Sequence, residues 1–141
     1  MSFIDSIVSH LPQHEGLLPK WLLFISVVSI FNSVQTYTNI NLTKKVYDGL
    51  KSTNQVTELS ARTFGTWTLM SSIIRFYCSY YISNPQIYQI CIYSYYLAFF
   101  HFGFEWFYFK TAKFGKGLLG PLIVSTVSIT WMLNQRDFYT I

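Results

Sequence analysis

Seven polar side chains lie within or at the edge of long apolar runs in this sequence, and they are the residues that could do chemistry. His101 and Glu105 are four residues apart, so they share one face of a helix. The other members are the cations Arg62 and Arg75 and the uncharged Asn32, Gln35 and Thr66. Ionisable groups inside a membrane helix are costly and often mark function. A functional site should therefore be sought among these residues.

Helix geometry predicts that most of these side chains lie at a similar depth. At a rise of about 1.5 Å per residue, His101 lies roughly 21 Å and Glu105 roughly 27 Å from the membrane surface on the side of the chain termini. Arg62 lies at roughly the depth of Glu105, and we expect an ion pair because an unpaired charge in lipid is costly. The predicted polar layer consists of Asn32, Gln35, Arg62, Thr66, His101 and Glu105.

Arg75 is predicted to lie apart from this layer. It is only about 9 Å from the same membrane surface, and about 18 Å from Glu105 along the membrane normal. These two opposite charges should therefore not pair directly. We expect the long Arg75 side chain to extend toward the nearby lipid headgroups instead.

The polar layer lacks the companions that catalysis or metal binding requires. One His and one Glu make a poor metal site, because metal ions take several protein ligands at characteristic spacing. His101 and Glu105 could act as a general acid–base pair, but no nucleophile, cofactor motif or second catalytic carboxylate accompanies them. We predict a hydrogen-bonded network that joins helices, with no catalytic residue, metal or cofactor. The alternative is a small membrane-embedded enzyme that uses His101 and Glu105.

Four apolar runs could hold these residues in helices that cross a bilayer. A spanning helix needs about 20 mostly apolar residues. The fourth run is short, and it reaches a workable length when Gly117 and Asn134 are added. The predicted spans are 18–37, 61–81, 87–109 and 118–133. We therefore predict an all-α membrane protein with a single four-helix transmembrane domain over residues 1–141.

The composition favours a membrane protein. Hydrophobic residues make up 51% of the 141 residues and charged residues only 11%, against about 25% charged residues in soluble domains. The net charge of +4 does not indicate a nucleic-acid partner, because most of the ten Lys and Arg lie near the ends of apolar runs. Cys78 and Cys91 lie inside apolar runs without a metal or redox motif. We expect both to be free, buried thiols.

The basic residues also predict how the chain crosses the membrane. The connections between spans 1–2 and 3–4, with their edges, carry seven Lys and Arg, whereas the side of the termini carries only Lys20 and Arg136. The positive-inside rule then makes both connections cytosolic and both termini luminal. Residues 3–11 repeat apolar side chains on one face of a helix. An N-terminal helix in the membrane interface and a disordered tail are both open for this segment.

Several segments resemble the ergosterol biosynthetic protein 28 family. The most specific is Ala61-Arg62-Thr63-Phe64-Gly65-Thr66-Trp67-Thr68, followed by Ile74-Arg75. Three further segments resemble the family in the same order: Leu18-Pro19-Lys20-Trp21-Leu22 with Asn32 to Gln35, His101-Phe102-Gly103 with Glu105, and Gly117 to Ser128 running into Trp131-Met132. The resemblance covers nearly the whole chain.

This resemblance implies a non-catalytic scaffold in the endoplasmic reticulum membrane. The implied partners are the sterol C-4 methyl oxidase, the C-3 sterol dehydrogenase/decarboxylase, the 3-keto sterol reductase and the sterol C-24 methyltransferase, together with membrane lipids. Besides the membrane-embedded enzyme, a sterol- or lipid-binding carrier that uses the aromatic surface of the second and third spans is an alternative. Ser29 and Ser33, four residues apart, suit close helix packing and are compatible with a homodimer.

Overall fold

The computed structural model describes residues 2–140, and this part of the chain is helical without any strand. Four long helices correspond to the predicted spans: α2 (Leu18–Gln35), α4 (Glu58–Tyr80), α5 (Pro85–Phe107) and α6 (Lys116–Asn134). Three short helices accompany them: α1 (Phe3–His10), α3 (Asn41–Val46) and α7 (Arg136–Tyr139). The all-α prediction is confirmed, and each long helix begins and ends within a turn of the predicted bounds.

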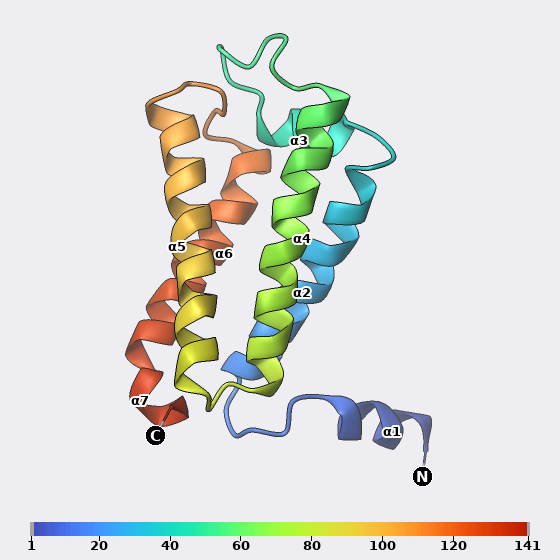
Figure 1. The fold of residues 1–141 in the computed structure, drawn as a ribbon, viewed down its shortest axis with the longest axis vertical. Helices are drawn as coiled ribbons and strands as arrows, with labels where there is room; N and C mark the ends of the chain where they lie inside the picture. The colour runs from blue at the N-terminus through green and yellow to red at the C-terminus, as the bar shows by residue number, and fades with distance from the viewer. Residues whose placement is uncertain (1, 141) are drawn as a thin grey trace.

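The four long helices form an up-and-down bundle (Figure 1). α2 packs mainly on α4 and α6 mainly on α5, while α4 and α5 join the two pairs. The chain termini and the α4–α5 turn lie at one end, which we call the terminal end. α3 and the α2–α4 and α5–α6 connections lie at the other end, which we call the loop end. The basic residues of the two connections therefore gather at the loop end.

Local sequence signals set the helix starts that position these ends. The Thr57 hydroxyl accepts a 3.1 Å hydrogen bond from the backbone N–H of Ser60, and the Ser60 hydroxyl accepts a 2.8 Å bond from the backbone N–H of Thr57. The Asn84 side chain caps α5, and Pro85 occupies its first turn, where a missing N–H costs nothing. These caps fix the loop-end start of α4 and the tight turn into α5.

The bundle exposes many large apolar side chains and buries several serines beside its apolar cores, which is unusual for a water-soluble protein. Large apolar side chains point outward on every long helix, such as Phe31, Met70, Leu97 and Ile123. Serines are buried between the helices: Ser26, Ser33, Ser72, Ser79, Ser94, Ser125 and Ser128. Most donate their hydroxyl to a backbone carbonyl one turn earlier. Small polar residues at helix contacts are typical of helices that pack within lipid.

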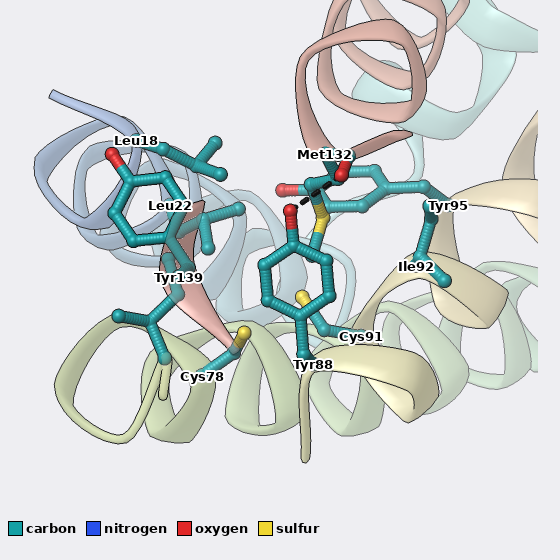
Figure 2. Close-up of a cluster of buried hydrophobic side chains, with 10 residues drawn as sticks. Leu18, Leu22, Cys78, Tyr88, Cys91, Ile92, Tyr95, Met132 and Tyr139 are labelled. Atoms are coloured by element: carbon teal, nitrogen blue, oxygen red, sulfur yellow. Dashed lines mark hydrogen bonds between the residues drawn. The ribbon is translucent and has the colours of Figure 1, made fainter. Parts of the chain in front are cut away.

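The core at the terminal end joins all four long helices and α7 (Figure 2). The Tyr88 hydroxyl of α5 donates a 2.5 Å hydrogen bond to the backbone carbonyl of Met132 in α6. Cys78 and Cys91 are buried here as free thiols, as predicted. The buried members are Leu18, Leu22, Cys78, Ile82, Tyr88, Cys91, Ile92, Tyr95, Met132 and Tyr139.

A second, smaller core lies at the loop end. Its buried members are Val46, Ala98, Phe102, Ala112 and Leu118. α6 approaches α3 closely here, because a Cβ atom added to Gly117 would lie only 1.9 Å from the carbonyl oxygen of Lys45. This close approach holds the loop-end connections against the bundle.

Two of the four long helices, α2 and α6, are long and apolar enough to cross a membrane by length and composition. Ser, Thr and two Arg lower the mean hydropathy of α4, and Tyr, Gln and His lower that of α5. Both helices nevertheless expose large apolar side chains. The prediction of membrane spans is therefore supported for α2 and α6 by their own composition, and it is a proposal for α4 and α5.

α1 extends sideways from the terminal end (Figure 1). The Ser2 and Asp5 side chains cap its start, and the backbone carbonyl of His10 accepts a 2.7 Å hydrogen bond from the Tyr80 hydroxyl. None of its residues is buried, and the apolar Phe3 and Ile4 are 80% and 71% exposed. The N-terminal segment is therefore a helix, and its position in the membrane interface is a proposal.

Candidate functional site

Hydrogen bonds tie the two loop-end connections to each other. The backbone N–H of Gly49 donates to the carbonyl of Thr111 at 2.9 Å, and that of Lys51 donates to the carbonyl of Lys110 at 3.0 Å. Only glycine fits at position 49, because an added Cβ atom would lie 2.4 Å from the Lys110 carbonyl oxygen. We call this unit, residues 40–57 and 108–115, the loop cap.

Tyr47 links the loop cap to His101 of α5. Its hydroxyl lies 2.6 Å from His101 Nε2, although the two residues are 54 positions apart in the sequence. Aromatic rings surround the pair: Phe64 packs edge-on against Tyr47 at 5.5 Å, and Trp67 packs edge-on against His101 at 5.4 Å between ring centroids. The hydrogen bond therefore lies in an apolar setting, where it is stronger than in water.

The raised pKa of Tyr47 keeps its hydroxyl available as a hydrogen-bond donor. Burial raises the pKa of the Tyr47 hydroxyl above its ordinary value, and the Glu105 carboxylate raises this pKa further. The hydroxyl therefore stays protonated at physiological pH. It can donate its proton to Nε2 of the imidazole.

Glu105 holds the start of the α5–α6 connection. Its carboxylate accepts a short hydrogen bond from the Thr111 hydroxyl. Its backbone carbonyl accepts bonds of 2.9 and 3.0 Å from the N–H groups of Thr111 and Ala112. Tyr47, Glu105 and Thr111 also line a cavity of about 430 Å³ between the loop cap and α4. Glu105 thus acts on the loop cap, as His101 does.

The predicted Arg62–Glu105 ion pair is absent from the described residues. Within residues 2–140, the charged pair in contact is Lys113 with Asp48, at 3.8 Å, and Arg62 is exposed. Equal depth does not ensure contact, because direction around the helix axis also matters. Arg62 follows the buried Ala61, and successive residues of a helix point about 100° apart.

The other members of the predicted layer do not join it into one network. Thr66 forms a short hydrogen bond with the hydroxyl of Tyr37, which links α4 to the end of α2. Gln35 is exposed, and Asn32 lines a larger cavity within the bundle. His101 and Glu105 meet at the loop cap, whereas these three residues lie apart from them.

Arg75 does not extend toward the terminal end, contrary to the expectation from its depth. It is only 6% exposed. Its Nε and Nη2 atoms donate to the hydroxyl and the carbonyl of Ser94, at 3.2 and 3.3 Å. The guanidinium carbon lies 3.9 Å from the ring centroid of Tyr95. α5 therefore attracts this side chain inward through hydrogen bonds and a cation–π contact.

The larger cavity has a volume of about 760 Å³. Its inner wall includes Arg75 and Trp67 of α4 and Tyr95 of α5. Its exposed lining residues include Asn32 of α2 and Gly120 of α6, so it opens between these two helices. No periodicity within a single helix predicts this cavity, because it arises from the separation of the two helix pairs.

Several site residues escape prediction from the sequence. Tyr47 and Thr111 lie in connections, and Ser94 and Tyr95 have the same types as many of their neighbours in α5. No local signal singles out Tyr47, because its connection also contains the apolar Ile40, Leu42 and Leu50. Its contact with His101 depends on the tertiary fold.

The arrangement supports a structural role for His101 and Glu105. Within residues 2–140, no three His, Cys, Asp or Glu side chains converge as a metal site would require. His101 bonds to Tyr47 and Glu105 bonds to Thr111. Both side chains therefore hold the loop cap on the bundle.

Comparison with known proteins identifies relatives along nearly the whole chain. The family described as Erg28 like protein matches residues 18–130. The chain is 60% identical to ergosterol biosynthetic protein 28 of Candida albicans, over 99% of this chain and 98% of that protein. It is 54% identical to the Saccharomyces cerevisiae protein of that name (89% and 84%) and 40% identical to the Homo sapiens homolog (84% and 84%). No solved structure matches the chain significantly.

Proposed function

Since the chain belongs to the Erg28-like protein family, we propose that it is a non-catalytic scaffold of the endoplasmic reticulum membrane in ergosterol biosynthesis. The scaffold tethers the sterol C-4 methyl oxidase, the C-3 sterol dehydrogenase/decarboxylase and the 3-keto sterol reductase, and it contacts the sterol C-24 methyltransferase. Tethering raises the effective concentration of the partners, so weak contacts suffice.

The observation that carries this proposal is the outward apolar surface of the bundle. All four long helices direct large apolar side chains outward and small hydroxyl side chains inward. This pattern supports four membrane spans, and it leaves the whole lateral surface available to lipid and to the membrane helices of partners. The apolar face of α1 adds contact with the membrane interface.

The orientation follows from the charges at the two ends. The loop end carries seven basic residues, among them Lys44, Lys51 and Lys110. The positive-inside rule makes the loop cap cytosolic and the termini luminal. The loop cap is then the part of this chain that faces cytosolic catalytic domains.

The scaffold role is tested by the sterols and the enzymes of cells that lack this chain. Deletion should slow C-4 demethylation, so that 4-methyl sterol intermediates accumulate. Each C-4 demethylation enzyme, assayed alone in solubilised membranes, should keep its intrinsic activity. Re-expression of the chain should restore the sterol profile.

The same experiment separates the scaffold from the membrane-embedded enzyme. His101→Gln and Glu105→Gln remove both candidate acid–base groups, and a scaffold whose fold survives should still restore the sterol profile. Conversion of a sterol by the purified chain alone would contradict the scaffold proposal.

A further inference from the structure

We propose that the 760 Å³ cavity binds one sterol-sized lipid that carries an anionic oxygen group, with Arg75 as the anchor for that group. The choice of a sterol body rests on the proposed role in sterol biosynthesis. The cavity and its cation are independent of that role.

The cavity has the size and lining of a small-molecule site. Pockets that enclose a single ligand measure about 300–1,000 Å³ and are lined mostly by apolar and aromatic side chains with a few polar groups. Trp67, Phe64 and Phe102 supply aromatic surface here. Along α4 the lining extends from Phe64 to Arg75, about 16 Å at the helical rise. A rigid, flat, apolar body of that length fits such a slot.

Arg75 is a buried cation without an acidic partner among the described residues. Within residues 2–140, the charged pair in contact is the distant Lys113–Asp48. The hydrogen bonds of Arg75 use Nε and Nη2 and end on uncharged oxygens of Ser94. A guanidinium has five N–H donors, so donors remain. Burying an unpaired charge is costly, and a ligand carboxylate would offset this cost with strong, charge-assisted hydrogen bonds.

Thr68 supplies a second polar group in the same cavity. Its hydroxyl is buried and makes no hydrogen bond in the described residues. Thr63 and Thr66 of the same helix instead donate to the carbonyl four residues earlier, at 3.0 and 2.8 Å. Thr68 precedes Arg75 by seven residues, so both lie on the same face of α4. A polar substituent on the lipid would satisfy this hydroxyl.

The route into the cavity is lateral. Its exposed lining residues include Val28 and Asn32 of α2 and Gly120 of α6, and the charged Lys45, Asp48 and Lys116 line its loop-end rim. These helices meet at the terminal end, where Trp21 Nε1 donates a 3.0 Å hydrogen bond to the Ser128 hydroxyl. Because the opening lies on the outward surface of the bundle, a lipid can enter from the bilayer.

Equilibrium binding to the purified full chain, in phosphatidylcholine nanodiscs, tests the anchor. The probes are cholesteryl hemisuccinate as the anionic sterol, cholesterol as the neutral sterol, and phosphatidic acid as an anionic lipid without a sterol body. Wild-type chain should prefer cholesteryl hemisuccinate over cholesterol. Arg75→Gln should weaken hemisuccinate binding about tenfold or more and leave cholesterol binding unchanged. Arg136→Gln makes the same charge change at an exposed position of α7. It should alter neither hemisuccinate binding nor cholesterol binding.

A second variant tests the cavity without touching Arg75. A Cβ atom at Gly120 would meet nothing within 4 Å, so Gly120→Phe can fold and place its ring in the cavity. It should abolish binding of both sterols, whereas Ile123→Phe, on the exposed face of the same helix, should not.

Three results would overturn the proposal: unchanged hemisuccinate binding in Arg75→Gln, unchanged sterol binding in Gly120→Phe, or equal binding of phosphatidic acid and hemisuccinate. The assay uses this chain alone. Its failure therefore leaves the tethering of enzymes untouched, and a failure of tethering leaves this binding result intact.

Discussion

The hydrogen bond between Tyr47 and His101 joins the α2–α4 connection at the loop end to helix α5. It is well formed at 2.6 Å, and aromatic rings flank both partners. Glu105 does the same for the other connection through Thr111. Single polar side chains inside the bundle thus determine the shape of its exposed loop end.

Tyr47→Phe should destabilise the chain by about 1 kcal/mol, because it removes one hydrogen bond and leaves His101 Nε2 without its partner. Thermal unfolding of the purified chain in mild detergent measures this change. Tyr108→Phe is the matched control, since Tyr108 is 69% exposed. Equal melting temperatures for the two variants would show that the Tyr47 bond adds nothing.

Tyr47 also predicts a response to alkaline pH. Its pKa is raised in the folded chain, whereas in the unfolded chain it is about 10. Above about pH 10 the unfolded state binds fewer protons than the folded state, so stability falls as pH rises further and is unaffected below this pH. Melting temperatures at several pH values should show a smaller alkaline loss for Tyr47→Phe than for wild type. Identical alkaline losses would contradict the raised pKa.

Arg62 and Glu105 should act independently of each other. Since Arg62 is exposed and no ion pair forms between them in the described residues, the effects of Arg62→Gln and Glu105→Gln on stability should add within about 0.5 kcal/mol. Glu105→Gln alone should be the more costly, because it weakens the bond to Thr111. A coupling energy well above that limit in the double-mutant cycle would show that the two charges interact.

At the scale of helices, two glycines allow neighbouring helices to pack closely. Gly65 lies against α2, where an added Cβ atom would be 2.9 Å from the Ser33 carbonyl oxygen. Gly117 lies against α3, where an added Cβ atom would be 1.9 Å from the Lys45 carbonyl oxygen. Both obstacles are backbone atoms, which cannot move away as a flexible side chain would.

Gly117→Ala should therefore separate α6 from α3 and destabilise the chain by about 1–3 kcal/mol, the usual cost of overpacking. Gly120→Ala, three residues further along the same helix, has open space around it. This control should be neutral or slightly stabilising, because alanine favours helix by about 0.5–1 kcal/mol over glycine. Thermal unfolding of both variants is the measurement, and a Gly117→Ala variant as stable as Gly120→Ala would contradict the close contact.

The sequence predicts the elements well and the contacts between them less well. Apolar run length is a local signal, so the helix bounds follow from it to within a turn, and the caps Thr57 and Asn84 set the observed starts of α4 and α5. Helix rise also predicts which residues lie near the loop end. Rotation about each helix axis is set by packing between helices. Helix rise alone therefore does not predict that Arg62 faces outward or that Arg75 bonds to Ser94. The cavity escapes prediction for the same reason.

At the scale of the whole molecule, the proposed orientation predicts the fate of a glycosylation sequence. Asn41-Leu42-Thr43 is an acceptor motif, and Asn41 is exposed at the start of α3. If the loop cap is cytosolic, Asn41 should carry no glycan. The same motif appended to the C-terminus through a flexible linker should be glycosylated in the lumen. Electrophoretic mobility of the protein before and after glycosidase treatment shows whether each site carries a glycan. A glycan on Asn41 would contradict the proposed topology.

We propose that this bundle assembles enzymes without acting on sterol itself. Purification of the tagged full chain from its native membrane in mild detergent, with mass spectrometry of the proteins that accompany it, tests this most directly. We expect the sterol C-4 methyl oxidase, the C-3 sterol dehydrogenase/decarboxylase and the 3-keto sterol reductase to be enriched together, relative to an unrelated four-span membrane protein purified in the same way. Recovery of the chain without any of these enzymes would contradict the scaffold.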